Sequence, residues 1–191
     1  MRRGAWGGAL ALVVAVLASL AGCAGSSSSG LIGDQAARDL AGEAVTVGQI
    51  ADYTAFVVNH TGHAATLESA RLVSLAGFPA PRQAPGLAIE AGRLIAFSAT
   101  GWPPAGGDFG LRPFRGYVVP PGARAQILYS VFSDVPGDFV AKGIEVTTRV
   151  AGATRTVLSL SGALTCVYRV RPRPCPDAYI NRVQAVVSKE Q

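Results

Sequence analysis

The sequence contains few of the side chains that hold metals or act as nucleophiles. Its 191 residues include two histidines, three cysteines and one methionine, which is the initiator. Blue-copper proteins bind their metal through two histidines, a cysteine and a weak axial ligand, usually methionine. Neither Cys166 nor Cys175 is followed by a histidine. The composition therefore excludes a blue-copper domain, and no cofactor is expected.

The motifs of common hydrolases and nucleotide-binding proteins are also missing. The chain has no G-x-S-x-G nucleophile elbow and no S-x-x-K pair. It also has no G-x4-G-K-[ST] loop to hold phosphates. The sequence therefore predicts a protein that is not an enzyme.

A long apolar run does occur, at the N-terminus. Arg2 and Arg3 precede a stretch without charged residues that extends to Gly22. A basic segment followed by an apolar segment is typical of a secretory signal peptide, although about 20 apolar residues can also span a bilayer. The run ends at Cys23 and is followed by the serine-rich segment 24–30. This ending favours a signal peptide over a membrane-spanning helix.

The end of the apolar run, Leu20-Ala21-Gly22-Cys23, resembles the lipobox of bacterial lipoproteins. The resemblance implies that a signal peptidase cuts before Cys23 and that the cysteine thiol carries a diacylglyceryl group. Two acyl chains are enough for stable anchoring. We therefore expect the mature protein to be held by lipid on the extracytoplasmic face of the cell membrane.

Removal of the signal peptide leaves 169 residues, which is enough for one domain with a real core. The expected organisation is a signal peptide at 1–22, a lipidated cysteine and flexible tether at 23–43, and a domain at 44–191. Cleavage also removes Arg2 and Arg3, which lowers the formal net charge from +5 to +3. This modest charge gives no support for a nucleic-acid partner.

Two cysteines remain once Cys23 is assigned to lipid. Disulfides persist outside the cytoplasm, so we expect Cys166 and Cys175 to be joined as a staple at the end of the domain. A metal site is not indicated there, because the chain has no C-x-x-C motif. Closing so short a loop contributes less than about 3 kcal/mol in the chain-entropy model.

From Val45 onward, short apolar segments alternate with glycine, proline and polar clusters, a pattern typical of strands. Within 124–132 and 144–150 apolar and polar residues alternate, which predicts strands with one buried face. Ala151-Gly152-Ala153 is expected to form a three-residue hairpin loop between antiparallel strands. The number and spacing of the segments indicate a sandwich or barrel. The expected strands are 44–50, 53–59, 64–75, 87–89, 93–98, 117–119, 124–132, 144–150, 154–160 and 163–170.

Two short helices are considered at the ends of the domain. The segment from Asp34 to Glu43 starts with a residue suited to an N-cap and contains good helix formers. It forms either one or two turns of helix or no ordered structure, because isolated short helices are marginal in water. Near the C-terminus, Ile180, Val183 and Val187 recur at helical spacing. This spacing predicts a short terminal helix after the disulfide.

Several features together resemble uncharacterised actinobacterial lipoproteins that carry an immunoglobulin-like domain. The resemblance implies an all-β, immunoglobulin-like antiparallel sandwich displayed at the cell surface, and it brings no catalytic residues. Phe139 lacks the hydroxyl that makes the tyrosine-corner hydrogen bond of immunoglobulin-like domains. The features are the lipobox, the serine-rich tether, the turn at 57–63, the segment Val119-Pro120-Pro121-Gly122, the pair Pro136-Gly137 and the late cysteine.

His60 and His63 form a His-x-x-His pair. On a helix this spacing places both side chains on one face, where they could bind zinc or copper. Between Val58 and Ala64, with Thr61-Gly62 inside, the pair instead indicates a hairpin turn. Zinc sites use at least three protein ligands, and the sequence implies no third one. We favour surface turn residues, and the rival hypothesis is a small metal-handling or hydrolytic envelope protein.

Two further features are candidates for binding a partner. Trp102 lies with Phe109 in a glycine-rich loop, where exposed aromatic residues often anchor partners; a plug over the end of the sandwich is the favoured alternative. Arg169, Arg171 and Arg173 alternate along the chain, so an extended backbone places them on one side. Their forked donors suit phosphate. A solvated edge protected by charge and proline is the favoured alternative for the arginines.

The sequence as a whole predicts a lipid-anchored module of the cell envelope that binds or assists a partner without catalysis. The membrane is one partner, through the lipid anchor. An envelope protein, anionic lipid head groups or an anionic wall polymer are the further candidates, the last two through the arginines.

Overall fold

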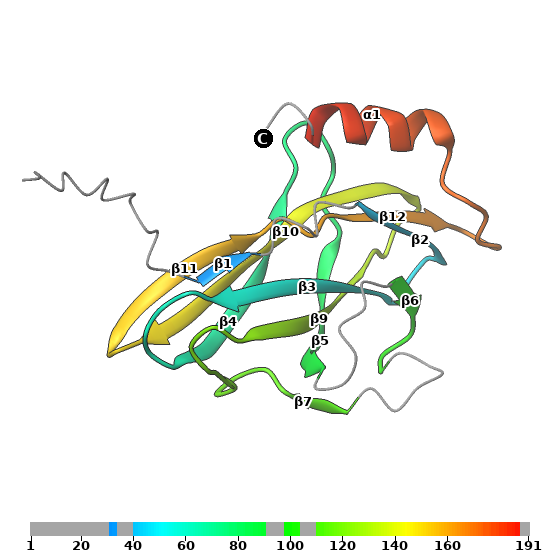
Figure 1. The fold of residues 1–191 in the computed structure, drawn as a ribbon. Helices are drawn as coiled ribbons and strands as arrows, with labels where there is room; N and C mark the ends of the chain where they lie inside the picture. The colour runs from blue at the N-terminus through cyan, green and yellow to red at the C-terminus, as the bar shows by residue number, and fades with distance from the viewer. Residues whose placement is uncertain (1–30, 34–39, 91–97, 104–109, 188–191) are drawn as a thin grey trace, which may run out of the picture.

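The computed structural model describes residues 31–33, 40–90, 98–103 and 110–187, which form a β-sandwich (Figure 1). Two six-stranded sheets face each other, and a cluster of buried apolar residues drawn from both sheets fills the space between them. The all-β sandwich predicted from the sequence is confirmed.

Sheet 1 has the strand order β1-β3-β9-β5-β7, with β6 also paired to β3, and sheet 2 has the order β2-β12-β10-β4-β8, with β11 paired to β10. The strands of sheet 1 are β1 (Leu31–Gly33), β3 (Ala51–Asn59), β5 (Arg82–Glu90), β6 (Ser98–Thr100), β7 (Leu111–Pro113) and β9 (Arg124–Phe132). Those of sheet 2 are β2 (Ala41–Thr46), β4 (Ala65–Ser74), β8 (Val118–Val119), β10 (Gly137–Val150), β11 (Ala153–Ser159) and β12 (Ala163–Tyr168).

Two tyrosines connect the sheets through the core. The Tyr53 hydroxyl on β3 donates to the carbonyl oxygen of Leu164 at 2.8 Å, and the Tyr129 hydroxyl on β9 donates to that of Ser161 at 2.9 Å. The two rings stack with their centroids 5.8 Å apart. Burial raises the pKa of both phenols above their ordinary value, so both remain protonated donors. The contacts fix β12 and the segment before it against sheet 1.

The alternation expected in β9 is confirmed on its inner face, where Ile127, Tyr129 and Val131 are fully buried. The outer face of the same strand is not solvated as predicted, because Gln126 and Ser130 are fully buried as well. In β10 the alternation over 144–150 is confirmed on both faces. The period-two pattern therefore predicts the buried inner face of β9 correctly. It does not predict that the outer face of sheet 1 is also shielded from solvent.

Ordered strands begin before the expected domain boundary at residue 44. Leu31–Gly33 pairs with the end of β3, and Ala41–Thr46 lies parallel to β12, so part of the expected tether belongs to the sandwich. The short helix considered at 34–43 is not formed at its end, since residues 41–43 are strand; residues 34–39 lie outside the described residues. The parallel pair is an exception to the expected antiparallel arrangement.

The hairpin between β10 and β11 has a two-residue loop, since Val150 pairs with Ala153. The antiparallel pairing is confirmed, and the expected three-residue loop is one residue too long. Ala151 and Gly152 both have positive φ, 47° and 81°. This combination is the type I′ turn that matches the twist of a tight hairpin.

Periodicity missed the first half of β10 because both of its faces are covered there. Phe139, Val140 and Ala141 are consecutive and all buried, so no alternation is visible in the sequence. The cover on the outer face is helix α1 (Asp177–Val187), which lies across sheet 2 in Figure 1. Its buried Val183 belongs to the same apolar cluster as Val140. The predicted C-terminal helix is confirmed.

Gly143 lies where β10 exchanges its neighbour. Before it, Ala141 pairs with β12, and after it, Ile144 pairs with Ser159 of β11. A Cβ atom on Gly143 would be 1.9 Å from the carbonyl oxygen of Ser159, so the absence of a side chain allows the two strands to approach.

We predict that Gly143→Ala lowers the free energy of unfolding by at least about 2 kcal/mol, because backbone atoms must move to relieve the clash. Gly62→Ala is the matched control, because a Cβ atom there would meet nothing within 4 Å, and its effect should stay within about 0.5 kcal/mol. Chemical denaturation measures both. Equal effects of the two substitutions would show that the close approach is not needed.

Candidate functional site

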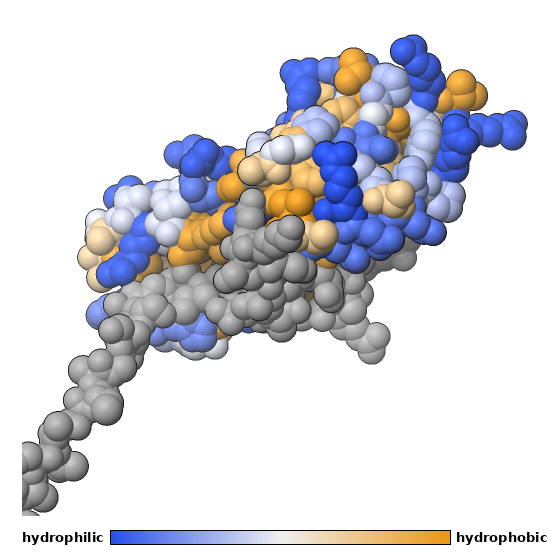
Figure 2. Space-filling view, turned by 90° about the horizontal axis from the view of Figure 1, so that it is seen from above, coloured by the Kyte–Doolittle hydropathy of each residue, from blue (hydrophilic) through white to orange (hydrophobic). Residues whose placement is uncertain are grey.

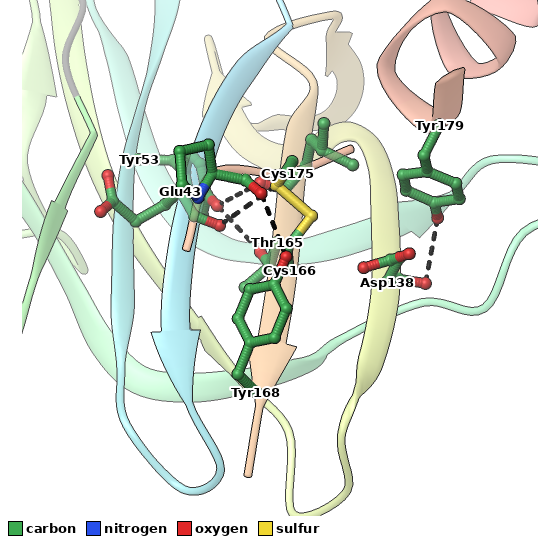
Figure 3. Close-up of a disulfide and its surroundings, with 10 residues drawn as sticks. Glu43, Tyr53, Asp138, Thr165, Cys166, Tyr168, Cys175 and Tyr179 are labelled. Carbon is green, nitrogen blue, oxygen red and sulfur yellow. Dashed lines mark hydrogen bonds between the residues drawn. A yellow bond between two sulfur atoms is a disulfide. The ribbon is translucent and has the colours of Figure 1, made fainter. Parts of the chain in front are cut away.

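Strand β12 leads directly into an exposed segment, residues 169–174, which we call the arginine loop. The disulfide between Cys166 and Cys175 closes this loop, with the two Cα atoms 5.6 Å apart (Figure 3). Cys166 is fully buried in the apolar cluster beneath α1. The predicted staple is confirmed, and it attaches the far end of the loop to the sandwich just before α1 begins.

Tyr168 stabilises the base of the arginine loop. Its hydroxyl donates to the carbonyl oxygen of Pro174 at 3.1 Å. The guanidinium carbon of Arg173 lies 5.3 Å from the centre of the Tyr168 ring, a geometry suited to cation–π attraction. The loop is thus held by covalent, hydrogen-bonding and aromatic contacts, all close to the disulfide.

The three arginines do not form the straight row that their spacing suggested. The backbone bends at Arg169 and Val170, and one open pocket of about 380 Å³ is lined by every residue from Tyr168 to Arg173. In a straight extended chain adjacent side chains point to opposite sides, whereas consecutive residues of this loop line the same pocket. The bend at Arg169 and Val170 departs from the extended chain that the spacing predicted, while all three arginines line the same pocket.

Three arginines outside the arginine loop, among the described residues, pair with carboxylates, whereas those of the loop do not. On sheet 2, Arg71 pairs with Glu145 at 2.5 Å and Arg149 pairs with Glu68 at 2.6 Å. Within the part of the chain that the structure describes, no arginine of the arginine loop makes a salt bridge. The sequence also has no acidic residue between Glu145 and Asp177.

Exposed valines lie in the loops beside the arginines. Val47, Val135 and Val170 are 37%, 56% and 80% exposed. The loops are linked by backbone hydrogen bonds from Val47 to Tyr168 at 3.0 Å and from Gly48 to Ser133 at 2.8 Å. We call this end of the molecule, formed by residues 47–50, 133–136 and 169–174, the valine–arginine tip. Sequence reasoning missed its valines, since a single valine in a turn produces no periodic signal.

The tip lies at the opposite end of the sandwich from the first described strand. Leu31 pairs with Asn59 at the end of β3, whereas Tyr168 pairs with Thr46, just before β3 begins. The nine residues of β3 separate the two ends by about 26 Å at the usual rise of a strand. In Figure 1, β1 lies beside one end of β3, and the loop after β12 lies beyond the other end.

Trp102 lies against the outer face of sheet 1. A Cβ atom on Gly86 of β5 would be 2.5 Å from the Trp102 ring and 2.2 Å from the Ser130 hydroxyl. The structure thus favours a role for Trp102 in covering the sandwich rather than in anchoring a partner. The surface that it covers is a face of the sandwich and not its end. Phe109 lies outside the described residues.

Beside this covered face, sheet 1 contains a buried carboxyl group that sequence reasoning missed. Asp52 on β3 is fully buried. Its Oδ1 accepts a 2.5 Å hydrogen bond from the Ser130 hydroxyl, while Oδ2 has no hydrogen-bond partner among the described residues. Burial raises the pKa of Asp52 to about 6 against the lowering effect of Ser130, and Glu43 adds a smaller upward contribution. An aspartate in a strand otherwise resembles a solvated residue, so only the three-dimensional structure identifies it.

The two histidines lie in the turn between β3 and β4, and both are exposed. The polar groups of this turn bind one another: the Asn59 amide and the Thr61 hydroxyl both donate to the carbonyl oxygen of His63. These contacts agree with His60 and His63 as surface turn residues. Among the described residues, no three His, Cys, Asp or Glu side chains are grouped closely enough to hold a metal ion.

The lipobox and Cys23 lie outside the described residues, so lipidation remains a prediction. Among the residues that the structure does describe, none forms a helix with the length and hydropathy needed to cross a bilayer.

We predict that Cys166→Ala/Cys175→Ala lowers the free energy of unfolding by about 2 to 3 kcal/mol, because the open chain gains conformational freedom when the loop is no longer closed. The protein should still fold, since the tyrosine contacts and α1 do not require the disulfide. Denaturation of the variant and of the parent under non-reducing conditions measures the difference. An unchanged stability would mean that the disulfide constrains nothing.

Asp52→Asn provides a pH-dependent test of the buried carboxyl. The folded protein holds the Asp52 proton more tightly than the unfolded chain does. Ionisation of Asp52 therefore lowers the free energy of unfolding as the pH rises from about 4 to about 6. The full loss of stability is present above about pH 6, and none of it is present below about pH 4. The stability of the variant relative to the parent should therefore rise by about 1 to 3 kcal/mol between about pH 4 and pH 7.5. Parallel pH profiles for the two proteins would contradict the assignment.

Comparisons with known proteins do not place the chain in a family. No family model matches the chain, and no curated protein matches it. Among solved structures, the chain is similar to the ASH / PapD-like domain of human CEP192 (PapD-like domain 7), with 7% identity, a TM-score of 0.37, and coverage of 70% of this chain and 84% of that chain. At this level of similarity, no property of that domain is transferred to this chain.

Proposed function

We propose that this protein is a lipid-anchored, extracytoplasmic module that binds an envelope partner through the valine–arginine tip and catalyses no reaction. The observation that carries the proposal is the tip itself. It combines three arginines without salt bridges among the described residues with three exposed valines, in loops connected to one another and closed by a disulfide. Exposed apolar side chains grouped with charged ones are typical of interaction surfaces.

The scaffold suits a binding role because it fixes the loop before a partner arrives. The Cys166–Cys175 disulfide and the Tyr168 contacts restrict the backbone of the arginine loop. A loop that is already ordered loses less conformational entropy on binding, so more of the contact energy appears as affinity. The rest of the sandwich supports this one end, with its core and its outer helix both packed against β12 and β10.

Anchoring is supported by the sequence of residues 20–23 and by the position of β1. Leu31 pairs with Asn59 at the end of the sandwich opposite the tip. A chain anchored at Cys23 therefore joins the domain at the end that leaves the tip unobstructed.

We predict that Cys23→Ser prevents lipidation and leaves either uncleaved precursor or protein released from the membrane, because the acylated thiol is the anchor. Fractionation of expressing cells with metabolic acyl labelling measures both effects. Ala24→Ser is the matched control and should remain labelled and membrane-bound. Acyl labelling and normal membrane retention of the Cys23→Ser protein would refute the anchor.

A further inference from the structure

The composition of the valine–arginine tip indicates the chemistry of its partner. Guanidinium groups bind phosphate oxygens through paired hydrogen bonds, and exposed valines gain free energy when they leave water for an apolar medium. An anionic lipid surface offers both together, with phosphates above an apolar layer. We infer that the tip docks on an anionic lipid surface, with the arginines at the head-group phosphates and the valines inserted beneath them.

The valines favour lipid over a phosphate-containing polymer. A polymer of phosphodiesters would satisfy Arg169, Arg171 and Arg173, but it provides no apolar layer for the neighbouring side chains. Of the five large apolar side chains that are exposed among the described residues, three lie at the tip: Val47, Val135 and Val170. The other two, Val118 and Leu158, lie in strands of sheet 2.

The charges around the tip are consistent with an anionic surface. Its own acidic residue, Asp134, is already paired with Arg82, so it does not oppose the arginines as a free carboxylate. Seen from above, apolar residues stand among strongly hydrophilic ones at the right-hand end of the molecule (Figure 2). The contact is expected to weaken with salt, since screening shortens the reach of exposed charges.

The tip reaches a second lipid surface, different from the one in which the lipid anchor at Cys23 is inserted. This step rests on the proposed function, because it assumes attachment at Cys23. The tether joins the sandwich at the Asn59 end of β3, and the tip lies beyond the Ala51 end, about 26 Å away along the strand. A sandwich standing on its tether therefore presents the tip to a second lipid surface, and the protein connects two surfaces.

A vesicle-clustering experiment tests the inference with the full mature chain. The lipidated protein is reconstituted into phosphatidylcholine vesicles and mixed with vesicles containing phosphatidylglycerol and phosphatidylcholine in equal amounts. We expect clustering, seen as increased light scattering, with the anionic vesicles and none with pure phosphatidylcholine. High salt should reverse it. Absence of clustering by the parent protein would overturn the inference.

Two tip variants separate the contributions of charge and apolar contact. Replacing Arg169, Arg171 and Arg173 by glutamine should weaken clustering about a hundredfold, at the usual gain for each basic residue near an anionic surface. Replacing Val47, Val135 and Val170 by serine should weaken it at least about tenfold. The matched controls are Arg112→Gln/Arg115→Gln/Arg155→Gln and Val118→Ser/Leu158→Ser, which should cluster vesicles as the parent does.

Other outcomes identify other partners. Binding of a glycerol phosphate polymer that needs the arginines but is unaffected by the valine variant would assign the tip to a polymer and overturn lipid docking. Clustering that disappears when phosphatidylglycerol is placed in the vesicle carrying the protein would show docking on the anchoring surface, which overturns the two-surface arrangement. Clustering that Arg112→Gln/Arg115→Gln/Arg155→Gln loses as strongly as the tip arginine variant would mean that net charge alone is responsible, which overturns docking by the tip.

Failure of the anchor is distinguishable from failure of the tip. If the protein does not remain on pure phosphatidylcholine vesicles during flotation, the proposed anchor is wrong. Flotation of the same full chain with anionic vesicles still measures the tip, through its dependence on the arginines and valines. Co-flotation that is lost in both tip variants supports lipid docking, and co-flotation unchanged by them overturns it.

Discussion

Two phenol groups that cross the core hold in place the strand that leads into the arginine loop. Tyr53 and Tyr129 extend from sheet 1 and donate hydrogen bonds to carbonyl oxygens in and just before β12. Such groups would be costly to bury without partners, so each tyrosine fixes the distance between the sheets at its position. Strand β12 continues into the arginine loop, and its placement therefore determines where the loop begins.

The other supports of the loop come from outside the core. Helix α1 covers the outer face of sheet 2, and its Val183 packs in one cluster with Cys166. The disulfide connects this covered strand to Cys175, two residues before α1, so the loop leaves and returns at positions held by packing. Residues 169–174, in contrast, are exposed. A loop that is held at both ends and exposed between them is well suited to binding a surface.

The sequence was sufficient to predict features that depend on local patterns. Alternation in 144–150, helical spacing at Ile180, Val183 and Val187, and two cysteines left for each other all appear in the structure. Each of these signals is contained within a short segment and is therefore visible without the fold. The exposed turn at His60 and His63 was predictable for the same reason, from Thr61-Gly62 between two strands.

The remaining features depend on contacts between segments that are distant in the chain. The outer faces of both sheets are covered in part. Near Phe139 this burial removes the alternation of apolar and polar residues in β10. On sheet 1 it leaves the Asp52 side chain buried, where a strand pattern would place a polar residue in solvent. The curved arginine loop follows from the disulfide and the Tyr168 contacts rather than from its own spacing. The exposed valines lie at the same end of the sandwich because backbone hydrogen bonds connect three loops that are distant in the chain.

The orientation of the domain relative to its bilayer is the central proposal, and a pair of labelled variants tests it most directly. Gly62→Cys places a fluorophore at the end near β1, and Val135→Cys places one at the tip. Each full-length lipidated protein is reconstituted into phosphatidylcholine vesicles that contain a lipid with a paramagnetic quencher on its head group. The proposed orientation predicts strong quenching at residue 62 and weak quenching at residue 135. Equal quenching at the two positions, or stronger quenching at residue 135, would contradict it.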